Sequence, residues 1–485
     1  MTQPFPPPKT QPFERLQVQD GLLMNAERWR RAHEYHRQRQ NVHYQSLNQP
    51  GIVCDLGVRL IPAPTEVSAQ YRDGRWLQIQ PGLAIDLLGN IIVVPEPIDY
   101  RITTEVATEE AAIVYLVVSY VDPEKLRRKE QREFVQETFR IDEKPSPPSE
   151  LEVELCRIFL TKDTVQLENP TDVFFPQQNA LDLRYRTQAK SRSQAVVSIA
   201  QINSHLPNLK TYSNLSYLLQ SVAALYPAFE GADKVGQLTM QSEEKFKLEN
   251  YDLLYLSYQP SQSLKVLQWD AITQYIESGG VLLVEISTEG TNIQELRGVQ
   301  QELKKALANL ELNTNAPNPS YQNPTGKAEV SSIRQKLKTE IADIKTDLDE
   351  QISQVSLVFK DFAQTLGTPL ESLERLNRNH PLRTQPFLFA ALPVINEQEI
   401  QLLVGGGIIV IIGNLSAAWG LDETLSFPRE TIRTAQELGI NILNFSWRRR
   451  QLMQSQQPEK RLISQPTPPR REKQKNLRSV FEQLE

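Results

Sequence analysis

A single apolar stripe constrains this chain more than any other feature. Between residues 330 and 362, apolar side chains recur at steps of three and four, the spacing of one face of a helix. The flanking residues are mostly Lys, Glu, Asp and Gln, so the stripe is narrow. A helix of this length measures roughly 50 Å. The stripe comprises Val330, Ile333, Leu337, Ile341, Ile344, Leu348, Ile352, Val355, Phe359 and Phe362.

A second helix is predicted over residues 292–311, followed by a turn rich in Asn and Pro over 313–326. We therefore expect an antiparallel helical hairpin, inserted at 290–366. Two interpretations of its stripe stay open: packing against 293–310 within one chain, or contact with a neighbouring copy or partner. Under the second, the contact residues are Leu337, Ile341, Ile344 and Leu348.

The hairpin interrupts a predicted α/β domain at 194–447. Before it, the apolar runs AVVSIAQI, LLYLSYQ and VLLVEIS alternate with helices predicted over 213–226 and 264–278. Continuous apolar strands of this kind suit a parallel sheet covered on both faces. After the hairpin, QLLVGGGIIVIIGN predicts a strand pair, PRETIRTAQELG a helix and INILNFSW a last strand.

The first third of the chain has a different pattern. Residues 25–48 predict a helix with Asn25 as N-cap, and 51–121 and 151–160 contain short β-branched runs typical of antiparallel strands. We expect a helix plus β-module over 19–165, after an extended proline-rich arm at 1–18 and before a linker at 166–193. One face of the helix carries Trp29, His33, His36, Gln40, His43 and Leu47, and is expected to pack against the β-module.

The expected fold class is therefore α+β and α/β multidomain. It consists of an N-terminal helix plus a small antiparallel β-module, then a three-layer α/β sheet domain with an inserted long helical hairpin.

Composition excludes several classes of protein. The net charge of −6 argues against a general nucleic-acid binder. Two cysteines, far apart in sequence, exclude a disulfide framework and a cysteine zinc site. The start of the chain lacks a basic-then-apolar signal, and no apolar run reaches about 18 residues. A cytoplasmic protein is the expectation.

The last 38 residues have a positive balance that the rest of the chain lacks. Residues 448–485 contain ten basic and four acidic side chains, and are predicted to form a flexible tail. The tail is interpreted either as a solvated segment or as a docking arm for an acidic partner or an anionic membrane surface. Arg448, Arg449 and Arg450 are its candidate contact residues.

Catalytic and metal-binding patterns are weak. His43 lies about 10 Å along the helix axis from His36, too far for one shared ion. A Ser287 and His380 pair with Glu285 is the enzymatic alternative, although no nucleophile motif surrounds Ser287. We assign no catalytic, cofactor-binding or metal-binding residue, and no cofactor.

Residues 13–160 resemble a module found in the loci of contractile injection systems, the phage-tail-like particles of bacteria. The matching motifs are Gly21–Ala26, Tyr35-His36, Gly51–Val58 and Pro81–Val94, with ETFRI at 137–141 and ELCRIFL at 154–160. Members of this family are baseplate or tail-associated structural proteins. The helix start at Trp29 departs from the acidic start of the family.

Residues 194–447 without the hairpin resemble a domain of unknown function that is similar to the class I glutamine amidotransferase fold. The resemblance rests on YIESGGVLLVEIS, LESLERLNRNHPLRTQPFLF and GGGIIVIIGNLSAAWG. Active amidotransferases carry a cysteine after the strand that follows the glycine pair. Glu285 stands there in this chain, so the resemblance implies no thiol chemistry.

Together the two resemblances imply a non-enzymatic structural component of a contractile injection system, at or next to the baseplate, as a cap, crown or membrane anchor. Its partners would be baseplate or tail proteins and copies of itself in a threefold or sixfold arrangement. Trp29 and Tyr35 would be contact or packing residues. The glutamine-rich, cysteine-poor composition is similar to that of filamentous cyanobacteria, which adds the inner face of a cytoplasmic or thylakoid membrane as an expected location.

Overall fold

The computed structural model divides the chain into two compact units, Met1–Arg192 and Ser193–Glu485. It describes residues 8, 11–106, 110–122, 134, 136–162, 164, 166–203, 208–239, 248–259, 269–288, 291–315, 324–373, 375, 377–395, 398–420 and 426–456. Each unit is presented by itself. Residues 1–7, 9 and 10 of the predicted proline-rich arm and residues 457–485 of the predicted tail lie outside the described residues.

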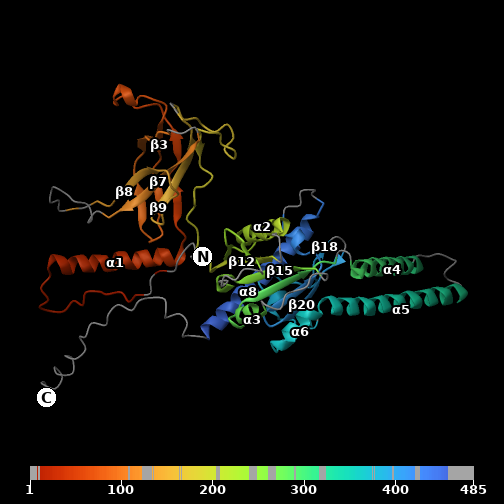
Figure 1. The fold of residues 1–485 in the computed structure, drawn as a ribbon. Coiled ribbons are helices and arrows are strands. Elements are labelled where there is room, and N and C mark those ends of the chain that lie inside the picture. The colour runs from red at the N-terminus through yellow and green to blue at the C-terminus, as the bar shows by residue number, and fades with distance from the viewer. Residues whose placement is uncertain are drawn as a thin grey trace, which may run out of the picture. The chain divides into compact units, whose positions relative to one another are not determined.

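The first unit consists of one long helix and short strands in antiparallel sheets (Figure 1). Two sheets have three strands, in the orders β1-β4-β5 and β2-β3-β6, and one has four, in the order β10-β9-β7-β8. The elements are α1 (Ala26–Leu47), β1 (Gly51–Asp55), β2 (Val58–Leu60), β3 (Trp76–Ile79), β4 (Gly82–Ile85), β5 (Ile91–Val94), β6 (Ile98–Arg101), β7 (Ala112–Val121), β8 (Thr138–Lys144), β9 (Glu152–Leu160) and β10 (Leu181–Asp182).

One core serves all three sheets. Leu77 of β3, Ile92 of β5 and Leu116 of β7 belong to the same buried cluster. The three sheets therefore pack face to face around a shared core, as expected for the predicted β-module. β8 lies between 51–121 and 151–160, the two stretches in which strands were predicted.

The predicted linker at 166–193 is wrong for most of its length. β10 pairs with β9, the Gln49 amide donates to the Lys190 carbonyl at 2.8 Å, and the Ile52 amide donates to the Thr187 carbonyl at 2.8 Å. The segment is polar, yet it belongs to the first unit because it satisfies backbone groups, which composition does not reveal.

The second unit is built on a seven-stranded sheet in the order β14-β12-β15-β16-β21-β20-β17. Neighbouring strands from β14 to β21 are parallel, and β20 and β17 add antiparallel pairs at one edge. β11 pairs with β13 and β18 with β19 in two further two-stranded sheets. The strands of the second unit are β11 (Ala195–Val197), β12 (Ile199–Asn203), β13 (Phe229–Gly231), β14 (Gly236–Thr239), β15 (Leu253–Tyr258), β16 (Val281–Ile286), β17 (Glu371–Ser372), β18 (Val394–Ile395), β19 (Gln398–Glu399), β20 (Gln401–Gly405) and β21 (Ile408–Ile412).

Helices cover both faces of this sheet (Figure 1). The odd-numbered positions of β15, such as Leu253, pack with α2 and α8, and the even-numbered ones, such as Leu254, pack with α3 and α6. The predicted three-layer arrangement and the mixed fold class are confirmed. The helices are α2 (Leu209–Leu225), α3 (Trp269–Glu277), α4 (Asn292–Asn315), α5 (Pro324–Val355), α6 (Leu357–Thr365), α7 (Pro381–Thr384) and α8 (Arg429–Ser455).

The predicted last strand, INILNFSW, is helical. It lies in the middle of α8, where Ile440, Ile442 and Leu443 pack into the core and the Asn441 side chain donates to the Leu382 and Phe387 carbonyls at 2.9 and 2.8 Å. A helix buried on several sides loses its 3.6-residue periodicity, so the pattern resembles a strand. The same helix continues through residues 448–455, which the sequence had indicated as tail.

The apolar stripe spans two helices. α5 ends at Val355, and α6 begins at Leu357 after Ser356, whose hydroxyl donates to the Ile352 carbonyl at 2.6 Å. Phe359 and Phe362 of the stripe therefore lie on α6, against the sheet. α5 has 32 residues, or about 48 Å, close to the predicted length, but it ends at Val355 and does not continue through Phe362.

Candidate functional site

Glu285 stands near the carboxyl end of β16 and is buried. The Tyr255 hydroxyl donates to its carboxylate, and the Ser416 backbone amide donates to it at 2.8 Å. Burial raises the pKa of Glu285. Its carboxylate thus joins β15 to β16 and holds the turn that follows β21.

The Ser287 and His380 pair proposed from the sequence is wrong. Ser287 follows the carboxyl end of β16, which is level with Ile412 of β21. His380 lines a hollow beside Gly405, and Gly405 pairs with Ile408 at the opposite end of β21. The four residue steps from Ile408 to Ile412 span about 13 Å, so the two side chains are at opposite ends of the sheet.

His380 instead shapes a turn. It is the N-cap residue of α7, and its Nδ1 accepts a hydrogen bond from the Leu382 amide at 3.3 Å. Its ring lies against Phe445, with centroids 5.6 Å apart. The imidazole therefore has a structural partner on both its edge and its face.

The hairpin helices α4 and α5 lie side by side (Figure 1). Leu348 is buried at the base of α5, while Leu337, Ile341 and Ile344 are half-buried. Near the other end, Arg334 pairs with Glu311 of α4 at 3.6 Å. Leu348 and Ile344 thus pack into the core of the second unit.

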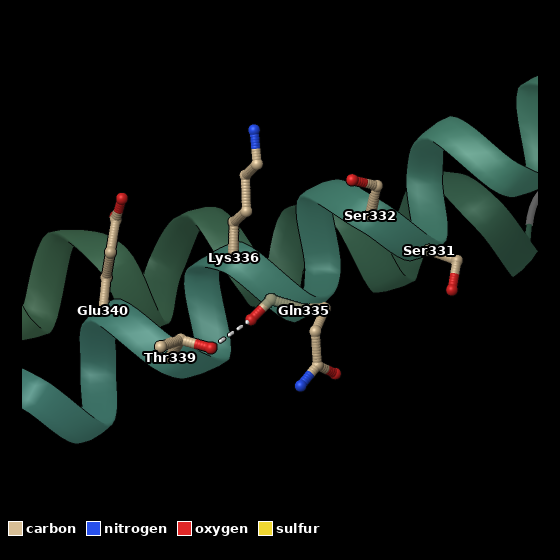
Figure 2. A pocket seen from close by; sticks show the side chains of 6 residues that line it. All are labelled: Ser331, Ser332, Gln335, Lys336, Thr339 and Glu340. Carbon is tan, nitrogen blue, oxygen red and sulfur yellow. Dashed lines mark hydrogen bonds between the residues drawn. The ribbon is translucent and has the colours of Figure 1, made fainter.

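The outer surface of α5 has a shallow hollow (Figure 2). Its lining comes from consecutive turns of one helix: Ser331, Ser332, Gln335, Lys336, Thr339 and Glu340. Figure 2 shows these side chains spread along the helix, and the Thr339 hydroxyl donates to the Gln335 carbonyl at 3.0 Å. Polar groups that do not converge on one point make a poor ligand site.

α1 has no buried residue along its 22 positions. Its contacts with the strand module come from one side of its last three turns: Arg37 pairs with Asp122 at 3.5 Å, Asn41 donates to Asn90 at 2.8 Å and Gln45 donates to the Leu88 carbonyl at 2.6 Å. The predicted packing face is therefore wrong. His33, His36 and His43 are exposed, because polar pairs rather than apolar contacts hold this helix.

The first turn of α1 and the segment before it carry several exposed apolar side chains. Trp29 is 60% exposed and its ring meets that of His33. Tyr35 packs edge-on against Phe13, with centroids 6.4 Å apart. We call this the N-terminal apolar surface; its exposed members are Phe13, Val18, Leu23, Met24 and Trp29.

The three arginines predicted as tail contacts are on α8. Arg449 donates to the Ile276 and Gly280 carbonyls at 2.8 and 2.7 Å, and Arg450 pairs with Asp252 at 3.3 Å. Arg448 is exposed and donates to the Gln385 side chain. Two of the three therefore tie the end of α8 to the sheet domain.

Among the described residues, no group of three or more His, Cys, Asp or Glu side chains is placed to hold a metal ion. Within the same residues, no helix has the length and hydropathy needed to cross a membrane.

Comparisons with known proteins add little. No protein-family model and no curated protein matches the chain. Among solved structures, one titled "Crystal structure of TssK" is similar at 9% sequence identity and a TM-score of 0.23, over 80% of this chain and 66% of that one. The chain thus spans slightly less than two thirds of that protein, and a likeness at this TM-score carries no conclusion about fold or function.

Proposed function

We propose that this protein is a non-enzymatic structural component of a contractile injection system, at or next to the baseplate. The observation that carries the proposal is the N-terminal apolar surface, because exposed apolar side chains concentrated in one segment are typical of a protein–protein contact site. It belongs to the unit whose motifs resemble the baseplate-associated module. This unit would dock on the particle, and the sheet domain and hairpin would contact neighbouring copies.

The Pro81–Val94 motif, on which part of the resemblance rests, forms the turn that contacts α1. This structural role supports the resemblance. The Asp86 carboxylate accepts from the amide and side chain of Asn90, each at 2.8 Å. Asn90 in turn accepts from Asn41 of α1. Gly89 has a positive φ of 78°, and a β-carbon there would collide with the Asn41 carbonyl. The turn formed by this motif is thus the part of the β-module against which α1 packs.

The contacts of α1 with the β-module come from its last turns. Its first turns are therefore available to bind a partner. The helix carries five arginines and two glutamates, so its surface is basic as well as aromatic. Arginine and tryptophan are enriched among residues that dominate protein interfaces. An acidic groove on a particle subunit would complement this surface.

The test is affinity capture of the tagged chain from a host that makes contractile particles, followed by negative-stain imaging. Sheath, tube or baseplate subunits should be captured, and Leu23→Glu with Trp29→Glu should reduce their yield at least tenfold. The matched control is Leu388→Glu in the second unit, which is also exposed, at 81%, and should leave capture unchanged. A monomer that captures no particle subunit would refute the proposal.

The proposal also includes a copy number: the chain would assemble into rings of three or six copies, because repeated subunits usually form closed symmetric assemblies. Mass photometry of the captured complex measures the copy number.

A particle location at the cytoplasmic face of a membrane belongs to the same proposal. It predicts salt-sensitive binding to anionic vesicles that is lost on deleting 457–485.

A further inference from the structure

A hollow of about 500 Å³ opens between α8, α7 and the turn that joins β20 to β21. This volume is in the range of small-molecule sites. One part of its wall is apolar, from Pro369, Val404, Phe445 and Leu452. The opposite end of the sheet carries Glu285, so the hollow is separate from the position that the amidotransferase resemblance would assign to chemistry.

Two guanidinium groups line the same hollow, from Arg448 and Arg449. Neither pairs with a carboxylate among the described residues, since the acceptors of Arg449 are the carbonyls of Ile276 and Gly280 and that of Arg448 is the Gln385 amide oxygen. Glu371, an exposed carboxylate, also lines the hollow. Two cations against one exposed anion leave the wall positive.

The position of Arg449 makes this charge costly. It is half-buried, its guanidinium lies against Gly407, and burial lowers its pKa. Carbonyl oxygens satisfy its hydrogen-bond donors but do not neutralise its charge, which a low-dielectric wall screens poorly. An anion in the hollow would supply the missing negative charge.

We propose that this hollow binds a small organic anion, with its carboxylate or phosphate near Arg448 and Arg449 and an apolar body against Phe445 and Leu452. The His380 ring, fixed against Phe445, completes the apolar wall. This site is independent of particle docking, because it lies in the second unit.

Benzoate is a suitable probe, with benzyl alcohol and benzylamine as neutral and cationic probes of similar shape. Saturation-transfer NMR on the full chain should show saturable benzoate binding, at least fivefold tighter than either of the other two. Inorganic phosphate tests whether the apolar body matters, and should bind at least fivefold more weakly than benzoate.

Arg448→Gln should weaken benzoate binding about fivefold, a change of about 1 kcal/mol. Leu452→Glu should weaken it about tenfold or more by placing a like charge in the hollow; Leu452 is 60% exposed, so the fold should tolerate the change. Arg433→Gln, an exposed arginine on the same helix that pairs with Glu437, is the control and should leave binding unchanged.

Equal binding of benzoate and benzylamine, or unchanged binding in both test variants, would overturn the proposal. Phosphate binding as tight as benzoate would overturn the part played by the apolar wall.

Discussion

The carboxylate of Glu285 is enclosed by protein, and it accepts hydrogen bonds from Tyr255 of β15 and from the turn after β21. Burial raises its pKa, and the Tyr255 hydroxyl beside it is buried as well. A carboxyl at this position has no described histidine or cysteine in contact with it. Its role in the structure is to join β15, β16 and the turn that follows β21.

A raised pKa makes stability depend on pH in a definite direction. The folded state holds the Glu285 proton more tightly than the unfolded state does, so this group's contribution is complete below the unfolded pKa and is lost as pH rises through the folded pKa. Urea unfolding at several pH values should therefore show wild type losing stability relative to Glu285→Gln as pH rises above about 4.3. Glu295→Gln, an exposed carboxyl on α4, is the control. A stability difference that stays constant with pH would contradict the assignment.

At the scale of elements, α1 and the hairpin are held in opposite ways. α1 depends on a few polar contacts with the Leu88, Gly89 and Asn90 turn. Gly89→Ala should therefore cost about 1–3 kcal/mol, because it combines a strained φ with a collision against the Asn41 carbonyl. Hydrogen exchange should show α1 amides losing protection while those of β7 and β9 keep theirs. Gly21→Ala, with a φ of 81° and nothing within 4 Å of the added β-carbon, is the matched control, because it has the strained φ without the collision.

The hairpin depends on apolar burial at its base. Leu348→Ala, at 5% exposure, should destabilise the second unit by about 2–5 kcal/mol. Ile333→Ala, in the same stripe but 49% exposed, should cost less than half as much, since little apolar area is lost from the core. Chemical denaturation of both variants gives the comparison. Equal losses would mean that the outer hairpin contributes as much as its base.

At the scale of the whole molecule, each unit has its own hydrophobic core. Leu116 and Leu155 are central to the first, and Leu283 and Leu443 to the second. We expect residues 1–192 and 193–485 to fold when produced separately. Circular dichroism spectra of the two pieces should add up to that of the full chain. Loss of cooperative unfolding in either piece would show that the units depend on each other.

Much of the fold could be predicted because its signals are local. Residues 330–355 form a helix whose periodicity is unbroken, and the β12, β15 and β16 runs are continuous apolar strands typical of a parallel sheet. Asn25 was identified as an N-cap from residue type alone, and its side chain accepts from the Arg28 amide at 2.9 Å. These features depend on neighbours within a few residues.

The sequence by itself determined the fold class, the hairpin and the alternation of β12, α2, β15, α3 and β16, because hydrophobic periodicity encodes them. Only the tertiary structure decided which faces of the helices were buried. It made 440–447 a helix, since those residues are enclosed on several sides. It also seated α1 through Arg37, Asn41 and Gln45, and placed Ser287 and His380 at opposite ends of a sheet. Such pairings join residues far apart in the chain, and no local spacing records them.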